Sequence, residues 1–173
     1  RLSLISKGPY SSDCLNLAIK SETTLNTFEL QYLYGTGYPL TVILGALFIV
    51  LGKFFVITDP VIIVNFMSVL LSSAIVLIFY ILVKNLFESK AALISSAFLC
   101  LSPIFLGLST FGNSHIPSLL FLLLSMLNLK QFHDTKNNSH LYLSAVNLGL
   151  VGASRLQDLL MMSLPMFFFY LGL

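Results

Sequence analysis

The sequence predicts an all-α protein: a polytopic bundle of transmembrane helices with a juxtamembrane helix region on its outer face. Only 9% of the 173 residues are charged and 57% are hydrophobic, whereas a soluble domain carries about 25% charged residues. The mean hydropathy is +0.92. Long uncharged runs alternate with short charged loops. Because a backbone in lipid must satisfy its own hydrogen bonds, we expect these runs to be helical.

The composition also excludes several classes of function. The nine Lys and Arg and seven Asp and Glu residues cannot cover the surface of a soluble monomeric enzyme. A net charge of +2, scattered along the chain, is too small for a nucleic-acid-binding face, so no nucleic-acid partner is expected. Cys14 and Cys100 show no Cys-x-x-Cys or Cys/His spacing, which counts against a thiolate metal site or a disulfide scaffold.

Residues 1–60 form the first predicted unit, an outer-face loop with juxtamembrane helices. Within this unit, Pro39–Leu51 is apolar but only 13 residues long, below the roughly 20 that a helix needs to cross a bilayer. We therefore expect a helix that lies in the outer interface or re-enters the bilayer, with Pro39 in its first turn. The alternative is a tilted full span over residues 38–58.

Residues 61–173 form the second unit, which holds the transmembrane helices. Val61–Val83 and Ala91–Ser114 carry no charge, and the run 141–173 contains only Arg155 and Asp158 as charges. That run is too long for one span, so we expect a turn near these two residues. The last apolar stretch is shorter than a span, and the chain is expected to be a piece of a larger protein. The predicted spans are about 61–83, 91–109, 114–131, 141–157 and a truncated 160–173.

Lysines in the short loops predict the orientation. Lys84 and Lys90 flank the first loop between spans, and Lys130 and Lys136 lie in the third, whereas the turn 108–117 has no Lys or Arg. Cytoplasmic loops are enriched in Lys and Arg. The lysine loops are therefore predicted to be cytoplasmic, and the turn at 108–117 and the turn near Arg155 are predicted to lie on the outer or luminal face.

Three residues are candidates for chemistry, each beside a structural alternative. Asp13 follows two serines ahead of an expected helix, so it is a helix N-cap, a functional carboxylate, or both. Arg155 in an apolar run is costly without a partner. It either forms a neutralised pair with Asp158 or meets a lipid phosphate at the membrane surface. His115 is an ordinary turn residue or an acid, base or ligand.

Other known motifs do not occur in the sequence. There is no phosphate-binding Gly-rich loop and no Ser-x-x-Lys or Gly-x-Ser-x-Gly nucleophile pattern. The predicted spans 61–83 and 91–109 contain no Asp, Glu or His. This counts against a proton-coupled transporter, because such proteins carry acidic or His relays inside the membrane.

Four further motifs follow one another along nearly the whole chain, each weak alone but specific in its order and spacing. They are Ser12-Asp13-Cys14; Gly37-Tyr38-Pro39-Leu40, which opens an apolar segment ending at Gly52; a basic loop with Leu86-Phe87 followed by Ser102-Pro103; and Gly149-Leu150-Val151-Gly152-Ala153-Ser154-Arg155. This arrangement resembles the N-terminal part of the polytopic GT-C glycosyltransferases, which include the dolichyl-phosphate-mannose protein mannosyltransferases and their prokaryotic relatives.

The resemblance implies an integral-membrane, mannosyltransferase-like enzyme that transfers a sugar from a polyprenyl-phosphate-linked donor. The acceptor would be a protein, a lipid or a glycan, and membrane lipid would surround the enzyme. The resemblance implies a catalytic role for Asp13 as general base and substrate binding by Arg155, His115 and Tyr38. It also implies a multi-pass protein of a prokaryotic plasma membrane or the endoplasmic reticulum, with its active site on the non-cytoplasmic face.

The chain departs from the family pattern at two positions. His115 stands where the family often has an acidic residue in the next outer loop, and Cys14 replaces an acidic residue after the first Asp. No cofactor is therefore assigned, and a divalent metal stays an open alternative. The alternative functions are a non-catalytic membrane homologue and a lipid or solute transporter.

Overall fold

In the computed structural model, the described residues are Gly8, 11–33, 38–55 and 57–172, and these ranges contain eight α-helices. The prediction of an all-α fold is confirmed. Gly37 of the second motif and Leu173 lie outside the described residues. The helices are α1 Ser12–Thr27, α2 Pro39–Phe54, α3 Pro60–Leu86, α4 Ser89–Leu101, α5 Pro103–Ser109, α6 His115–Thr135, α7 Asn138–Ser154 and α8 Leu156–Gly172.

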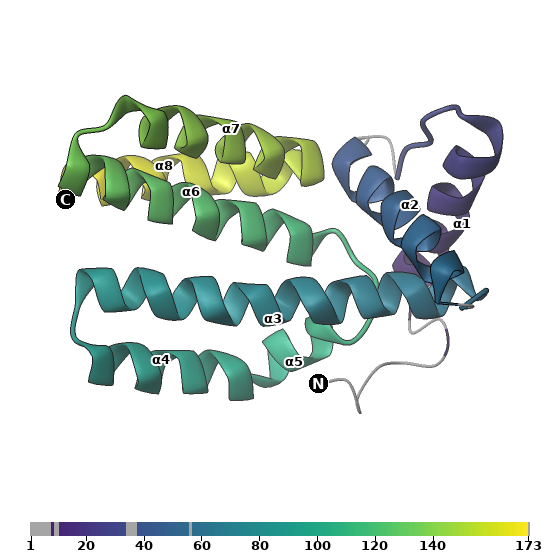
Figure 1. The fold of residues 1–173 in the computed structure, drawn as a ribbon, viewed down its shortest axis with the longest axis horizontal. Helices are drawn as coiled ribbons and strands as arrows, with labels where there is room; N and C mark the ends of the chain where they lie inside the picture. Colours follow the sequence, from purple (N-terminus) through teal and green to yellow (C-terminus); the bar gives the residue numbers. More distant parts are fainter. Residues whose placement is uncertain (1–7, 9–10, 34–37, 56, 173) are drawn as a thin grey trace.

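Helices α3 to α8 run back and forth as one bundle, and α1 and α2 pack against the beginning of α3 at one end (Figure 1). Among the described helices, α3 with its 27 residues is the one that is long and apolar enough to cross a bilayer alone. The pair α4 and α5 meets the same criteria when the two are counted as one broken span. Helices α2 and α8 are apolar but shorter.

The segment predicted as a span over 91–109 is broken in the structure, where α4 and α5 meet at an angle of 64°. Pro103 has no backbone N–H, and its ring disfavours a helical conformation at the preceding residue. Ser102 accordingly has a ψ of 122°. The following turn is also shorter than the expected 108–117: it covers residues 110–114, and α6 begins at His115. The bend directs Phe105 into a core with Ile75 of α3 and Ile116 of α6.

Prolines and capping side chains define where α2 and α3 begin. Pro39 and Pro60 occupy first-turn positions, where a missing N–H removes no helical hydrogen bond. Asp59 caps α3, since its Oδ1 accepts a hydrogen bond from the Val61 N–H at 2.8 Å. Pro39 therefore occupies the first-turn position that the sequence predicts. Helix α2 ends at Phe54, so it does not extend over the alternative range 38–58.

Small polar side chains hold α6 and α7 close together. Ser125 and Ser144 each donate a hydrogen bond to the other's backbone carbonyl at 2.9 Å, and their hydroxyl oxygens are 3.0 Å apart. Only Lys136 and Asn137 connect the two helices. Lys136 has a left-handed φ of 55° that ends α6, and the Asn137 side chain caps α7. Two sequence-adjacent helices thus form a tight antiparallel hairpin.

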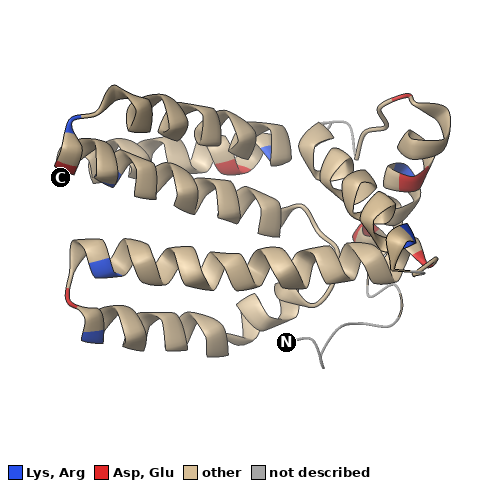
Figure 2. Cartoon of the chain, in the orientation of Figure 1, with Lys and Arg blue, Asp and Glu red and all other residues tan. Residues whose placement is uncertain are grey.

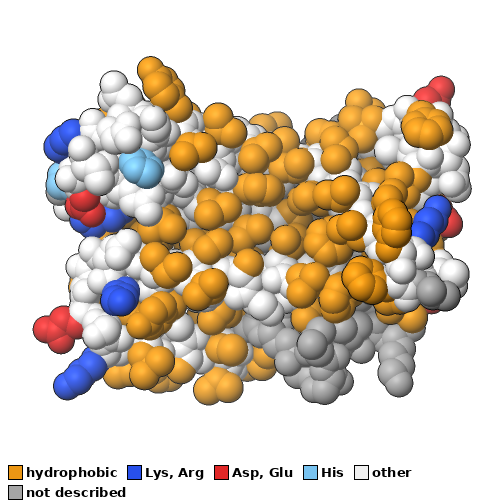
Figure 3. Space-filling view, in the orientation of Figure 1, with side chains coloured by type: hydrophobic (Ala, Val, Ile, Leu, Met, Phe, Trp, Pro, Cys, Tyr) orange, Lys and Arg blue, Asp and Glu red, His pale blue; other side chains and the backbone are white. Residues whose placement is uncertain are grey.

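Charged side chains concentrate towards the two ends of the bundle, and apolar side chains cover much of the middle (Figures 2 and 3). One end, where α3 joins α4 and α6 joins α7, is called the lysine end; it carries Lys84, Lys90, Lys130 and Lys136. The opposite end, where α5 joins α6 and α7 joins α8, is called the arginine end; it carries Arg155 and Asp158. The loops with lysines and the turns without them, which the sequence predicts to lie on opposite membrane faces, are therefore at opposite ends of the bundle.

Candidate functional site

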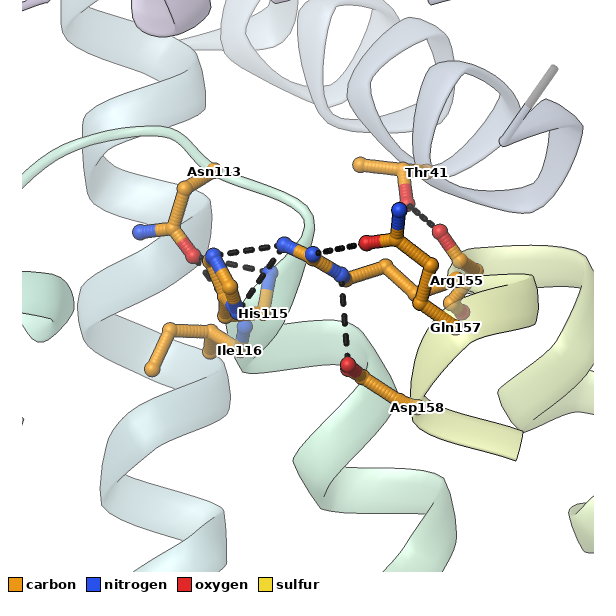
Figure 4. Close-up of polar contacts among 8 residues, drawn as sticks. Thr41, Asn113, His115, Ile116, Arg155, Gln157 and Asp158 are labelled. Carbon is orange, nitrogen blue, oxygen red and sulfur yellow. Dashed lines mark hydrogen bonds and ion pairs between the residues drawn. The ribbon is translucent and has the colours of Figure 1, made fainter. Parts of the chain in front are cut away.

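Arg155 lies at the break between α7 and α8, with an extended backbone. Three side chains contact its guanidinium group (Figure 4). Nε is 3.3 Å from Asp158 Oδ1, and Nη2 donates a hydrogen bond to Gln157 Oε1 at 3.0 Å. Nη1 is 3.0 Å from His115 Nδ1 and 2.5 Å from Nε2. With 16% of its side chain exposed, Arg155 is both oriented and partly shielded from solvent.

His115 is the first residue of α6 and not, as expected, a residue inside the turn. A guanidinium group can only donate hydrogen bonds, so a ring nitrogen that pairs with Arg155 must be an unprotonated acceptor. The contact therefore selects the neutral imidazole. Arg155 therefore contacts side chains of two helices, His115 of α6 and Asp158 of α8.

Asn113 fixes the position of His115, and sequence reasoning missed it. Its Oδ1 accepts hydrogen bonds from the N–H groups of His115 at 3.0 Å and Ile116 at 3.1 Å. Its Nδ2 donates to the carbonyls of Leu108 at 2.6 Å and Phe111 at 2.8 Å. One buried amide thereby closes the turn after α5 and caps α6. Ser114 occupies the position before the helix, and Asn113 one residue earlier is the recognisable signal, because Asn side chains favour such N-terminal hydrogen bonds.

Two residues at the beginning of α2, Tyr38 and Thr41, contact Arg155 and the neighbouring Ser154. The guanidinium carbon of Arg155 is 5.7 Å from the centroid of the Tyr38 ring, within the range of a cation–π interaction. Thr41 Oγ1 donates to the carbonyl of Ser154 at 3.4 Å. Tyr38 is itself buried in the core formed by α1, α2 and α3. Arg155, His115 and Tyr38, which are distant in the sequence, therefore meet at the arginine end.

Asp13 is the second residue of α1, and the interpretation of Asp13 as the N-cap is wrong. Ser11 is the cap: its backbone is extended, and its hydroxyl accepts from the Cys14 N–H at 3.3 Å. The Asp13 side chain is exposed, and a negative charge in a first helical turn is favourable. The structure therefore brings Arg155, His115 and Tyr38 together, and it places Asp13 in the first turn of α1.

Asn65 of α3 is a second amide that sequence reasoning missed. It is fully buried, and its Oδ1 accepts hydrogen bonds from the Gly112 N–H at 2.8 Å and from Cys14 Sγ at 3.0 Å. Its Nδ2 donates to the Gly8 carbonyl at 3.5 Å. An amide within the uncharged run at the start of α3 is the sequence signal that identifies it, because a buried amide requires partners.

A pocket of about 240 Å³ adjoins the Arg155 contacts between α5, α6 and α8. His115 and Asp158 line one edge, and the remaining wall is mainly apolar, with Phe105, Leu119, Leu122 and Met162. A second groove of about 440 Å³, between α2 and α3, is lined almost entirely by apolar side chains. Only the first of these two spaces combines an apolar wall with the candidate residues.

The donor set at the arginine end does not fit a metal centre. Within the described ranges, no three His, Cys, Asp or Glu side chains are grouped so that they could hold a metal ion. The Arg155 guanidinium also contacts both His115 and Asp158. A cation at that position would meet another cation, so the arrangement suits an anion better.

The comparison with known families matches residues 40–173 to the family described as dolichyl-phosphate-mannose-protein mannosyltransferase. The matched range includes His115 and Arg155 and begins just after Tyr38, so Asp13 lies before it. No curated protein and no solved structure matches the chain significantly. The family match confirms the resemblance to GT-C glycosyltransferases that the four motifs indicated. The chain therefore belongs to the dolichyl-phosphate-mannose-protein mannosyltransferase family.

Proposed function

We propose that the arginine end transfers a sugar from a polyprenyl-phosphate-linked donor to an acceptor hydroxyl. Family membership makes the protein a membrane, mannosyltransferase-like glycosyltransferase; the donor, the membrane face and the residue roles are the proposal. The observation that carries it is the position of Arg155. A guanidinium group that three side chains orient adjoins a pocket with an apolar wall, and a lipid-linked phosphate needs both features.

Arg155 is proposed to bind the donor phosphate. A guanidinium group has five N–H donors; Nη2 donates to Gln157 and Nη1 contacts His115, while Nε forms an ion pair with Asp158. Donors on Nη1 and Nη2 are therefore available for a phosphate oxygen. Arg–phosphate hydrogen bonds are charge-assisted and frequently bidentate. As the sugar leaves, the phosphate gains negative charge, and Arg155 stabilises that charge without moving.

Asp13 is proposed as the general base. The acceptor oxygen forms a bond to the anomeric carbon of the sugar while the bond from that carbon to the phosphate oxygen breaks. The phosphate leaves with the electron pair, and the acceptor proton moves to the Asp13 carboxylate. An exposed carboxylate at the start of α1 is accessible to an acceptor.

His115 and Tyr38 are proposed to position the donor. The neutral His115 ring lies at the edge of the 240 Å³ pocket and contacts Arg155. The Tyr38 ring supports the guanidinium group through its π face. Both side chains therefore act mainly on where the phosphate and the sugar are held. We assign them smaller contributions to the transfer rate than Asp13.

We further propose that the bundle crosses the membrane several times, with the arginine end on the outer or luminal face. The separation of Lys84, Lys90, Lys130 and Lys136 from Arg155 along the bundle supports this orientation (Figure 2), because cytoplasmic loops are enriched in Lys and Arg. A single cysteine introduced at Asn137 or at Thr110, in the full-length protein with Cys14 and Cys100 replaced, tests it with an impermeant thiol reagent. Labelling of position 137 by reagent added outside would contradict the proposed orientation and indicate the opposite one.

The decisive experiment uses full-length protein in lipid nanodiscs with dolichyl phosphate mannose that carries labelled mannose. Binding of this probe is measured first, and release of labelled mannose to protein, lipid and soluble glycan acceptors second. Binding and transfer together support the proposal. Binding without transfer to any acceptor would indicate a non-catalytic homologue, and absence of binding would refute a lipid-linked mannosyl donor.

A further inference from the structure

Asn65 connects the two chain segments that carry Asp13 and His115. It lies in the second turn of α3, where Oδ1 accepts one hydrogen bond from Cys14 Sγ at 3.0 Å and another from the Gly112 N–H at 2.8 Å. Cys14 is the residue after Asp13, and Gly112 belongs to the turn that leads to His115. One side-chain oxygen therefore joins the segments of the proposed base and of the proposed donor-binding His.

The surroundings of Asn65 make this connection rigid. Asn65 and Cys14 are fully buried, and a buried amide that loses its partners destabilises the fold, which favours keeping these bonds. Gly112 approaches α3 closely, since a Cβ at this position would be 2.8 Å from Val64 Cγ2 and 3.1 Å from Val64 Cβ. Asn113 then transmits the position of Gly112 to the first turn of α6 through its bonds to the His115 and Ile116 N–H groups.

Arg155 is positioned by a different set of contacts. Its own contacts come from Asp158, Gln157, His115 and Tyr38, whereas the described hydrogen bonds of Asn65 involve Cys14, Gly112 and Gly8. The structure thus separates two tasks. The junction of α7 and α8 presents the phosphate-binding group, whereas α3, through Asn65, sets the distance between the Asp13 segment and the turn that leads to His115.

We propose that Asn65 is a positioning residue for sugar transfer: its Oδ1 holds the base-bearing start of α1 and the His115-bearing turn in one geometry. Asn65 does not touch the reacting atoms. This inference rests on the proposed function for its catalytic consequence, but the connection itself is a structural claim that can be measured without any activity.

The catalytic consequence is tested with Asn65→Leu, which has a similar size but no acceptor, in full-length protein. The transfer rate is divided by the number of sites that bind dolichyl phosphate mannose, so that misfolded molecules do not count. We expect kcat per binding site to fall about 10- to 100-fold, while the Kd for the probe changes less than about threefold, because Arg155 keeps its contacts with Asp158, Gln157 and Tyr38. A purely structural role would reduce the number of binding sites and leave kcat per site unchanged.

Two further variants sharpen this test. Asn65→Asp keeps a side-chain oxygen at the same position and should restore most of kcat. Asn128→Leu is the matched control, because the Asn128 amide donates only to Leu124, four residues earlier in the same helix. This control should retain the rate of the unchanged protein. A rate per site for Asn65→Leu equal to that of the unchanged protein would overturn the inference.

Hydrogen–deuterium exchange provides the readout that does not depend on activity. If Asn65 joins the two segments, Asn65→Leu should accelerate exchange in peptides covering residues 11–18 and residues 107–116 together. Peptides from the α6–α7 hairpin should exchange as before. Unchanged exchange in both segments would overturn the connection even if the protein had no transferase activity. A failure of the unchanged protein to bind dolichyl phosphate mannose would instead refute the proposed function.

Discussion

The lysine end and the arginine end of the bundle use similar residues in different environments. At the lysine end, Lys130 pairs with Asp134, whose side chain is 48% exposed, and the hydrogen bond from Lys130 lowers the pKa of the Asp134 carboxyl. At the arginine end, Arg155 pairs with Asp158, but His115, Gln157 and Tyr38 also contact the guanidinium group. Exposed pairs of the first kind contribute little to stability, whereas the second arrangement fixes a cation in one orientation.

This difference indicates separate roles for the few charges of the chain. The lysines are distributed over several loops, as expected for residues that determine orientation in a membrane. Arg155 is surrounded by residues from α2, α6 and α8, as expected for a residue that must meet a ligand in a defined geometry. Substitutions at matched positions of the two ends should therefore have very unequal effects.

The largest effect is expected for Asp13→Asn. Loss of the proposed base should lower kcat about 10²- to 10⁴-fold, with binding of dolichyl phosphate mannose retained. Transfer of labelled mannose by full-length protein measures this effect. Glu22→Gln is the control, because Glu22 is also an exposed acid of α1 but lies in the second half of the helix. Unchanged transfer by Asp13→Asn would show that Asp13 is not the general base.

A smaller effect, on binding, is expected for Arg155→Gln. Loss of charge-assisted hydrogen bonds to phosphate should raise the Kd for dolichyl phosphate mannose about 10- to 150-fold. Arg155→Lys should be intermediate, because an ammonium group is a point charge without the planar fork. Lys84→Gln at the lysine end should bind as the unchanged protein does. Equal losses in Lys84→Gln and Arg155→Gln would show that general positive charge, not this site, binds the donor.

Gly112→Ala tests the packing that holds the arginine end together. The added Cβ would be 2.8 Å from Val64 Cγ2 and 3.4 Å from the Val64 backbone carbon, so the turn must move. We expect the free energy of unfolding to fall by about 1–3 kcal/mol, measured by thermal unfolding in detergent. Gly107→Ala is the control, since a Cβ there meets nothing within 4 Å. Equal midpoints for the two variants would contradict the close approach.

The smallest effect is expected for His115→Leu. Removing one hydrogen-bond partner of Arg155 costs about 1 kcal/mol, which corresponds to roughly a fivefold loss in kcat/KM for dolichyl phosphate mannose. His133→Leu at the lysine end should leave kcat/KM unchanged, because the nearest charged group to His133 is Asp134 at 3.7 Å. A loss of a hundredfold or more in His115→Leu would instead assign His115 a direct part in the chemistry.

The sequence predicts the helical class well because hydrophobic runs and charged loops are local features. The helix break at Arg155 has a local cause too, since an apolar run with two charges exceeds one span. By contrast, the bend at Pro103 and the cap at Ser11 each depend on a single residue. From the sequence alone, a proline-kinked span and a cap at Asp13 are equally plausible. The first of two serines, not Asp13, adopted the extended backbone of a cap.

The candidate site was only partly predictable. Arg155 and His115 are conspicuous because ionisable residues are rare in this chain. Their contact, and the cation–π contact with Tyr38, join positions about 40 and more than 100 residues apart, and no local pattern specifies such pairs. Asn65 and Asn113 were missed because the candidates were sought among ionisable residues, and an amide carries no charge. Their importance arises from burial, which only the folded chain reveals.

The reciprocal bonds of Ser125 and Ser144 have a consequence for how the protein is made. Each hydroxyl satisfies a carbonyl on the neighbouring helix, and only two residues separate the helices. During synthesis, the partner of each serine hydroxyl group therefore follows or precedes it by only a few tens of residues. In the proposed multi-span topology, an unpaired hydroxyl group would be costly in lipid, so α6 and α7 would leave the translocation machinery as one preassembled pair, with the Arg155 junction attached to it.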